Sequence, residues 1–253
     1  MQIFSSKDGT SLACWQSGHG EPLLLLHGTS GDHLTFSPII EKLSQHFSVW
    51  SLDRRGRGQS GDAEHYSLMS ECDDVAAVVE AIGGQVHIFA HSFGGLCALK
   101  AARLTKNIGK LMIYEAPLSL KGSSWSDSLN QHMQSLLDAG HREELLVMFL
   151  TEIVGASNKE IGIIKNADTW DERVAAAHTI LRELQVVDSY VFEAEKFQAV
   201  IVPTLLFLGA ESPERRRVIA NTLEQSLPNS SIVELLGQQH GAVRTAPDLL
   251  VDK

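Results

Sequence analysis

The chain has 253 residues, and 43% of them are hydrophobic, which is enough for one sizeable core and a single α/β domain. A formal net charge of −10, with 21 basic against 31 acidic residues and no basic stripe, argues against nucleic-acid binding. No apolar run approaches the ~20 residues of a membrane span, and the first residues, MQIFSSKDG, lack the regions of a signal peptide. We therefore expect a cytoplasmic protein with neither a nucleic-acid nor a membrane partner.

Buried strands and amphipathic helices alternate along the first half of the chain. Residues 2–16 hold two short strand-like runs around a Lys-Asp-Gly turn, which predicts a hairpin at the edge of a sheet. The unbroken apolar run Leu23–Leu26 is typical of a parallel strand buried on both faces. This alternation predicts a parallel sheet with right-handed crossovers. The next predicted elements are a helix over 36–46, a strand over 47–52, a helix over 67–82, and strands beginning at 86 and 110.

The alternation stops between residues 119 and 196, where the predicted elements are helices over 127–139, 141–154 and 170–184. Strands over 202–208 and 231–236, with a helix over 213–227 between them, then restore the sheet. The predicted fold class is α/β, with a mostly parallel, doubly wound sheet and a helical insertion.

Two further features concern cysteines and short basic runs. Cys14, Cys72 and Cys97 are odd in number and lack metal-ligand spacing, so we expect buried thiols in a reducing compartment. The runs 54–55 and 215–217 consist of arginines, and we expect a solvated face or local ion pairs for both.

The chemistry centres on residues 86–104, VHIFAHSFGGLCALKAARL, which predict a buried strand, a tight turn and a helix. The turn AHSFG is a G-x-S-x-G pattern with Ala90 in place of the first glycine. At such a sharp turn the positions two before and two after the serine must be small, and Ala90 and Gly94 meet that requirement. The turn would project Ser92 Oγ above the sheet as a nucleophile, with the helix N-terminus behind it.

Three more segments occur in a familiar order: LLLLHGTSG at 23–31, DRRGRGQS at 53–60 and GQQHGAVRTAP at 237–247. Together with the serine turn they resemble the α/β-hydrolase superfamily over about two thirds of the chain. The resemblance implies an eight-stranded-type sheet of the α/β-hydrolase fold, with a core formed by 1–118 and 197–253. It also implies that 119–196, inserted after the sixth strand, is a helical cap that shapes the substrate pocket.

The resemblance also implies the partners of Ser92. The backbone N–H groups of Thr29 and Phe93 would form the oxyanion hole. His240 would be the base, since histidine has a pKa suited to taking a proton and returning it. Its protonation predicts activity that rises with pH near 6 to 7. His27 and His91 are expected to be structural.

The triad acid departs from the commoner pattern of the superfamily. The usual aspartate position, three residues after the glycine of GAES, is occupied by Ser212, which cannot compensate an imidazolium. Glu115, at the end of the sixth strand, matches an alternative acid position in some members, and we prefer it. Glu211 stays open as the other candidate, because its longer side chain could reach His240 if the loop adjusts.

These residues predict a serine esterase of carboxylesterase type that cleaves an ester, thioester or lactone of a small to medium organic substrate through an acyl-enzyme. No cofactor and no metal are expected. The alternatives are a slow-turnover ligand-binding or signalling protein, and a C–C hydrolase or perhydrolase. Seven large apolar residues of the insertion could line a pocket or form its core: Trp125, Met133, Leu137, Met148, Phe149, Trp170 and Leu181.

Overall fold

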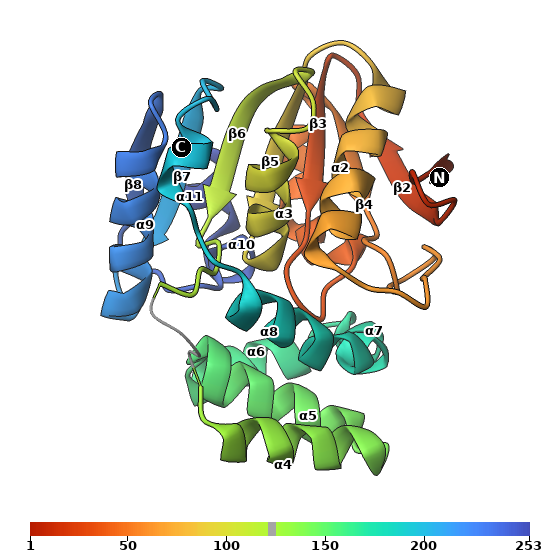
Figure 1. The fold of residues 1–253 in the computed structure, drawn as a ribbon, viewed down its shortest axis with the longest axis vertical. Coiled ribbons are helices and arrows are strands. Elements are labelled where there is room, and N and C mark those ends of the chain that lie inside the picture. Colours follow the sequence, from red (N-terminus) through yellow and green to blue (C-terminus); the bar gives the residue numbers. More distant parts are fainter. Residues whose placement is uncertain (121–124) are drawn as a thin grey trace.

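The computed structural model describes residues 1–120 and 125–253, and its centre is one eight-stranded sheet (Figure 1). The strand order is β1-β2-β4-β3-β5-β6-β7-β8. β2 pairs antiparallel with β1 and with β4, while every other pair is parallel, which confirms the predicted fold class. The strands are β1 Gln2–Ser5, β2 Ser11–Ser17, β3 Glu21–Leu26, β4 Phe47–Leu52, β5 Val86–His91, β6 Ile108–Tyr114, β7 Thr204–Gly209 and β8 Ser230–Leu235.

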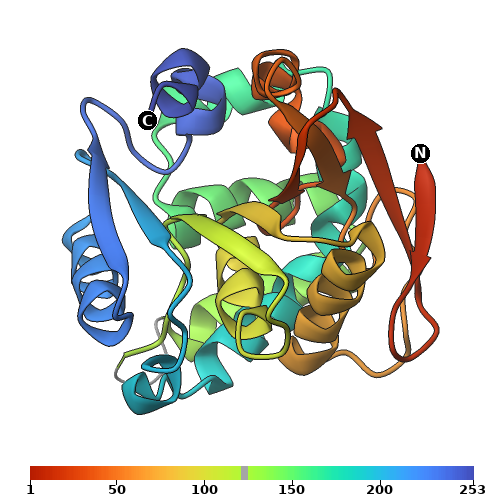
Figure 2. The ribbon, with the colours of Figure 1, turned by 90° about the horizontal axis from the view of Figure 1, so that it is seen from above.

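Helices cover both faces of this sheet (Figure 2). Leu24 and Leu26 of β3 pack with α2, α3 and α9, whereas Leu23 and Leu25 pack with α1, α10 and α11 on the opposite face. The unbroken leucine run is therefore explained, because a central parallel strand buries both sets of side chains. The helices are α1 Ser37–Leu43, α2 Leu68–Ile82, α3 Phe93–Ala101, α9 Glu214–Ser226, α10 Ala242–Thr245 and α11 Pro247–Val251.

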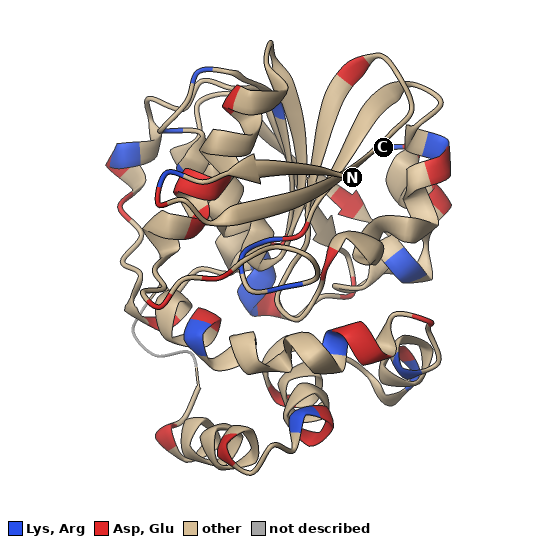
Figure 3. Cartoon of the chain, turned by 90° about the vertical axis from the view of Figure 1, so that its right-hand side faces the viewer, with Lys and Arg blue, Asp and Glu red and all other residues tan. Residues whose placement is uncertain are grey.

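A layer of helices separates β6 from β7 in the chain and lies against the end of the sheet where the parallel strands finish (Figure 1). It has an apolar cluster of its own, which includes Met133 and Leu181. Acidic and basic residues are interspersed along its helices (Figure 3). Residues 121–124 of the predicted cap lie outside the described residues. The helices of the layer are α4 Asp127–Asp138, α5 Arg142–Met148, α6 Asn158–Lys165, α7 Trp170–Ala175 and α8 Ile180–Ser189.

Three details of this layer differ from the predicted helices. α5 continues as a π-helix over Phe149–Val154, a form that is rare and often found near functional sites. The predicted helix over 170–184 is divided, because the 3₁₀ turn Ala176–Thr179 separates α7 from α8. α6 was not predicted, although a capping box at Ser157 and Glu160 starts it.

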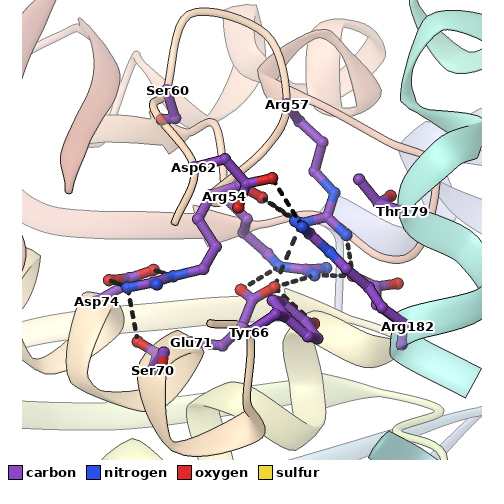
Figure 4. Close-up of polar contacts among 12 residues, drawn as sticks. Arg54, Arg57, Ser60, Asp62, Tyr66, Ser70, Glu71, Asp74, Thr179 and Arg182 are labelled. Atoms are coloured by element: carbon purple, nitrogen blue, oxygen red, sulfur yellow. Dashed lines mark hydrogen bonds and ion pairs between the residues drawn. The ribbon is translucent and has the colours of Figure 1, made fainter. Parts of the chain in front are cut away.

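A buried ion cluster, formed by Arg54, Arg57, Glu71 and Glu183, joins the helical layer to the core (Figure 4 labels Arg54, Arg57 and Glu71). Arg54 donates from Nε and Nη2 to the two carboxylate oxygens of Glu71 on α2, at 3.0 and 2.9 Å. Both arginines also donate to Oε1 of Glu183 on α8. Paired charges of this kind are tolerated in a core because each guanidinium keeps carboxylate partners.

This arrangement corrects one expectation for the run 54–55. Arg54 and Arg55 are 1% and 0% exposed, so the prediction of a solvated face is wrong, and the alternative of local ion pairing is confirmed. Arg55 donates to both carboxylate oxygens of Asp74 at 2.6 Å. Cys14, Cys72 and Cys97 are buried and unpaired, as expected. Among the described residues, no helix is both long and apolar enough to cross a bilayer.

Candidate active site

Ser92 lies at the sharp turn between β5 and α3, with φ 54° and ψ −124°. A positive φ is uncommon for a residue with a Cβ atom and stores strain at the turn. The turn also brings the backbone very close to β3. A Cβ atom on Gly94 would lie 2.6 Å from the carbonyl oxygens of Leu26 and His27. The small residues of the AHSFG pattern are therefore needed for close approach, and Ala90 is fully buried.

The loop after β3 passes over this turn. A Cβ atom on Gly28 would lie 2.8 Å from the Cβ of Ser92, so only glycine allows the approach. Thr29 follows Gly28 and lines the same cavities as Ser92. Phe93 is the first residue of α3, and the first N–H groups of an α-helix have no partner within the helix. The structure thus brings Thr29 and Phe93 to the cavity that contains Ser92.

His240 stands on the loop between β8 and α10, and residues of β5, β6 and β7 contact that loop. The hydroxyl of Tyr114 donates to the carbonyl of Gln239. His91 Nε2 lies 3.0 Å from the carbonyl oxygen of His240. Gly209 at the end of β7 allows the loop to pack closely, since a Cβ atom at this position would lie 2.6 Å from the carbonyl oxygen of Gln239. His91 is therefore a support of the loop.

Glu115 follows the last residue of β6 and has a φ of 49°. Its Oε2 lies 2.6 Å from His240 Nδ1. Its Oε1 accepts hydrogen bonds from the Gly209 N–H at 2.9 Å and from the Ser212 hydroxyl at 2.5 Å. Glu211 is exposed, and only its backbone contacts the His240 loop in the part of the chain that the structure describes. The geometry thus favours Glu115 over Glu211.

Arg216 on α9 is the site residue that the sequence reasoning missed. Its Nη1 donates to Glu115 Oε2 and lies against His240 Nδ1. Its Nη2 donates to the carbonyl of Val154, at the end of the π-helix, at 2.7 Å. The run 215–217 was the only signal, and it could not tell which arginine turns inward. Its neighbour Arg217 instead forms an exposed ion pair with Glu234.

The surroundings lower the pKa values of both Glu115 and His240. Burial acts to raise the pKa of Glu115, but the hydrogen bond and charge of His240, with the charge of Arg216, outweigh burial and hold it well below its ordinary value. Burial and then the positive charge of Arg216 lower the pKa of His240 to about 4, although Glu115 opposes the change. The imidazole is therefore neutral over a wider pH range than the expectation of 6 to 7.

Two chambers meet at Ser92 and His240, with empty volumes of about 860 and 1410 Å³. The smaller, called here the arginine chamber, is lined by Arg173 and Arg244. The larger, called here the apolar chamber, is lined by Leu118, Trp125, Ile153, Val187 and Ile219 among others. Of the large apolar residues of the helical layer, Phe149 lines both chambers and Trp125 lines one, whereas Met133 and Leu181 belong to the core of that layer.

His27 is buried and has a structural role, since its Nδ1 lies 2.8 Å from the Gly28 carbonyl and its Nε2 accepts from the Arg54 N–H. Among the described residues, one group has spacing that could hold a metal ion, namely Asp32, His33 and Asp53. Its atoms are already used, because Asp53 accepts from the His33 N–H at 2.8 Å and lies 2.8 Å from the His33 ring. This cluster fixes a loop and contributes no group to either chamber.

Comparison with known proteins identifies the family and the fold. The family described as "Alpha/beta hydrolase family" matches residues 23–253. The crystal structure of an alpha/beta hydrolase from Sphaerobacter thermophilus is 32% identical, covers 99% of both chains and superposes with a TM-score of 0.85.

Curated relatives include the pimeloyl-[acyl-carrier protein] methyl ester esterase of Xanthomonas campestris, which is 33% identical over 117 residues. That match covers 46% of this chain and 45% of the relative, so the chain spans less than half of that relative's length. A putative esterase/lipase of Haemophilus influenzae is 24% identical over 90% of this chain and 80% of the relative. The match of nearly the whole chain to the family, together with the fold, shows that the chain belongs to the α/β hydrolase family.

Proposed function

We propose that this protein is a serine hydrolase that cleaves a carboxylic ester of a small to medium organic substrate through an acyl-enzyme on Ser92. The observation that carries the proposal is the 2.6 Å contact between Glu115 and His240 Nδ1, beside a serine held at a strained turn and facing two chambers. A carboxylate at Nδ1 keeps the proton there and leaves Nε2 free to act as a base. Esterase-named relatives support the same reaction class.

The steps follow from these positions. Ser92 Oγ attacks the ester carbonyl carbon while His240 Nε2 takes its proton, and the N–H groups of Thr29 and Phe93 stabilise the oxyanion. His240 then gives the proton to the alcohol oxygen as the carbon–oxygen bond breaks. Water next attacks the acyl-enzyme, gives one proton to His240 and releases the acid, and that proton returns to Ser92. Glu115 compensates the imidazolium in both halves of the reaction.

Turnover of p-nitrophenyl esters tests the proposal directly. Ser92→Ala and His240→Ala should each lower kcat by roughly 10⁴ to 10⁶ with an unchanged circular dichroism spectrum. Ser189→Ala, an exposed serine at the end of α8, is the matched control and should keep full activity. A fluorophosphonate probe should label Ser92 rapidly. One stoichiometric burst without further turnover would contradict an esterase and favour a slow-turnover binding protein.

A further inference from the structure

The arginine chamber contains two cations that form no ion pair with a carboxylate of the described residues. Arg173 comes from α7 of the helical layer and Arg244 from α10 of the core, and both line the chamber that also contains Ser92 and His240. Two like charges in a partly enclosed cavity are unfavourable unless an anion joins them. Their presence beside the nucleophile therefore needs a physical reason.

The hydrogen bonds that these two arginines form with the described residues go to neutral groups. Arg173 Nη2 donates to the Ser30 hydroxyl at 3.3 Å, and Arg244 Nη2 donates to the Thr169 hydroxyl at 3.1 Å. Arg173 Nε is buried and finds no acceptor among the described residues. Within the described part of the chain, neither guanidinium lies within 4.0 Å of a carboxylate oxygen. By contrast, Arg54 and Arg216 are each paired with glutamate, while Arg215, which lines the apolar chamber, donates to the carbonyl of Ile153.

The electrostatic balance of the chamber is positive. Burial and then the charge of Arg244 lower the pKa of Arg173 to about 10, which reflects the cost of holding both cations there. Asp32 attracts both guanidinium groups from a distance, but its Oδ1 already accepts the Leu34 N–H at 2.9 Å. Glu160 also lines the chamber, with its Oε2 in the capping box of α6, so the described residues of the lining carry two guanidinium charges against this one carboxylate.

We infer that the arginine chamber binds a carboxylate group of the substrate, so that the ester cleaved at Ser92 carries a carboxylate on one side and an apolar group on the other. A guanidinium presents paired N–H donors that match the two oxygens of a carboxylate. The apolar half fits the apolar chamber, which joins the arginine chamber at Ser92 and His240. This inference rests on the proposed function and names its substrate class.

A matched pair of esters tests the inference. Monobenzyl glutarate carries a free carboxylate, and benzyl 5-oxohexanoate replaces that carboxylate with a neutral methyl ketone of similar size. The wild-type protein should hydrolyse the anionic ester with a kcat/KM at least ~10-fold higher, the usual range for a charge-assisted hydrogen bond. Arg173→Met and Arg244→Met should each reduce that preference about 10-fold or more, because the anionic ester loses a charge partner that the neutral ester does not use.

Control variants separate a lost charge from a damaged fold. Arg173→Lys should keep most of the preference because it keeps the charge. Arg142→Met removes an exposed arginine of α5 that lines neither chamber, and it should leave the preference unchanged. Equal hydrolysis of both esters by the wild-type protein would overturn the inference while leaving the esterase proposal intact, and so would a preference that survives both methionine substitutions.

A binding measurement distinguishes the two proposals. Calorimetric titration of monobenzyl glutarate into the Ser92→Ala protein reports affinity without turnover, and adding Arg173→Met should weaken it about 10-fold. Equal affinity with and without that substitution would overturn the inference. Arginine-dependent binding combined with no hydrolysis of any ester by the wild-type protein would instead overturn the proposed function.

Discussion

Arg216→Gln should move the acidic limb of the pH–rate profile upward. The base works only when His240 is neutral, so kcat/KM falls as the pH drops through the pKa of that imidazole. Burial and the charge of Arg216 lower this pKa from 6.5 to about 4 in the native protein. Removal of the charge raises the pKa, and the activity is then lost at a higher pH than in the wild-type protein.

The size of the shift follows from the contact. Two unit charges about 4 Å apart interact by about 4 kcal/mol at an effective dielectric constant of about 20, and 1.36 kcal/mol corresponds to about one pKa unit. This sets an upper limit of about three units. Burial of His240 is the larger cause of the lowering and stays in the variant, so we expect a rise of about one unit, to a pKa of about 5.

The assay is kcat/KM for a p-nitrophenyl ester between pH 3.5 and 8, with enzyme returned to pH 7 as a check on irreversible unfolding. Arg217→Gln is the matched control, because Arg217 is on the same helix and pairs with Glu234 on the surface. Its limb should coincide with that of the wild type. If kcat/KM of the Arg216→Gln protein fell at the same pH as that of the wild-type protein, the role assigned to the charge of Arg216 would be refuted.

Three other changes test the site and its support. Glu115→Gln should lower kcat about 10² to 10⁴-fold in the ester assay, whereas Glu211→Gln should cost little; the reverse order would exchange their roles. Glu183→Gln leaves two buried arginines with one carboxylate and should cost about 3 to 5 kcal/mol in urea unfolding. Glu152 is exposed, so Glu152→Gln serves as the control. If the Glu183→Gln protein unfolded at the same urea concentration as this control, the predicted loss of stability would be wrong. Gly94→Ala should prevent correct folding of the turn, visible as loss of soluble protein or of activity, because the new Cβ would meet two carbonyl oxygens at 2.6 Å. A fully active Gly94→Ala protein would disprove that steric argument.

The strands and the serine turn could be predicted because their signals are local. An apolar run such as Leu23–Leu26 and small residues around Ser92 are imposed by the backbone within a few positions. The division between α7 and α8 was missed, because the 3₁₀ turn between them contains no helix-breaking residue and packs against α5 within the helical layer.

The surroundings of the base could not be predicted in the same way. Arg216 reaches Glu115 across 101 residues of sequence, and Arg54 reaches Glu183 across 129. Such pairs depend on which face of α8 or α9 turns inward, and a row of arginines leaves that undetermined. The pKa expected for His240 was too high because it took account neither of the burial of the ring nor of the neighbouring cation Arg216.

The contact between Ser212 and Glu115 bears on how the acid of such a site can change during evolution. β6 and β7 are adjacent parallel strands, so their ends deliver side chains to the same point beside the base. Ser212 already reaches the proposed acid, at 2.5 Å from Glu115 Oε1. A carboxylate could therefore be gained after β7, at position 212, before Glu115 is lost after β6. An evolving protein would then carry two acids for a time, and the imidazolium would keep a carboxylate partner throughout.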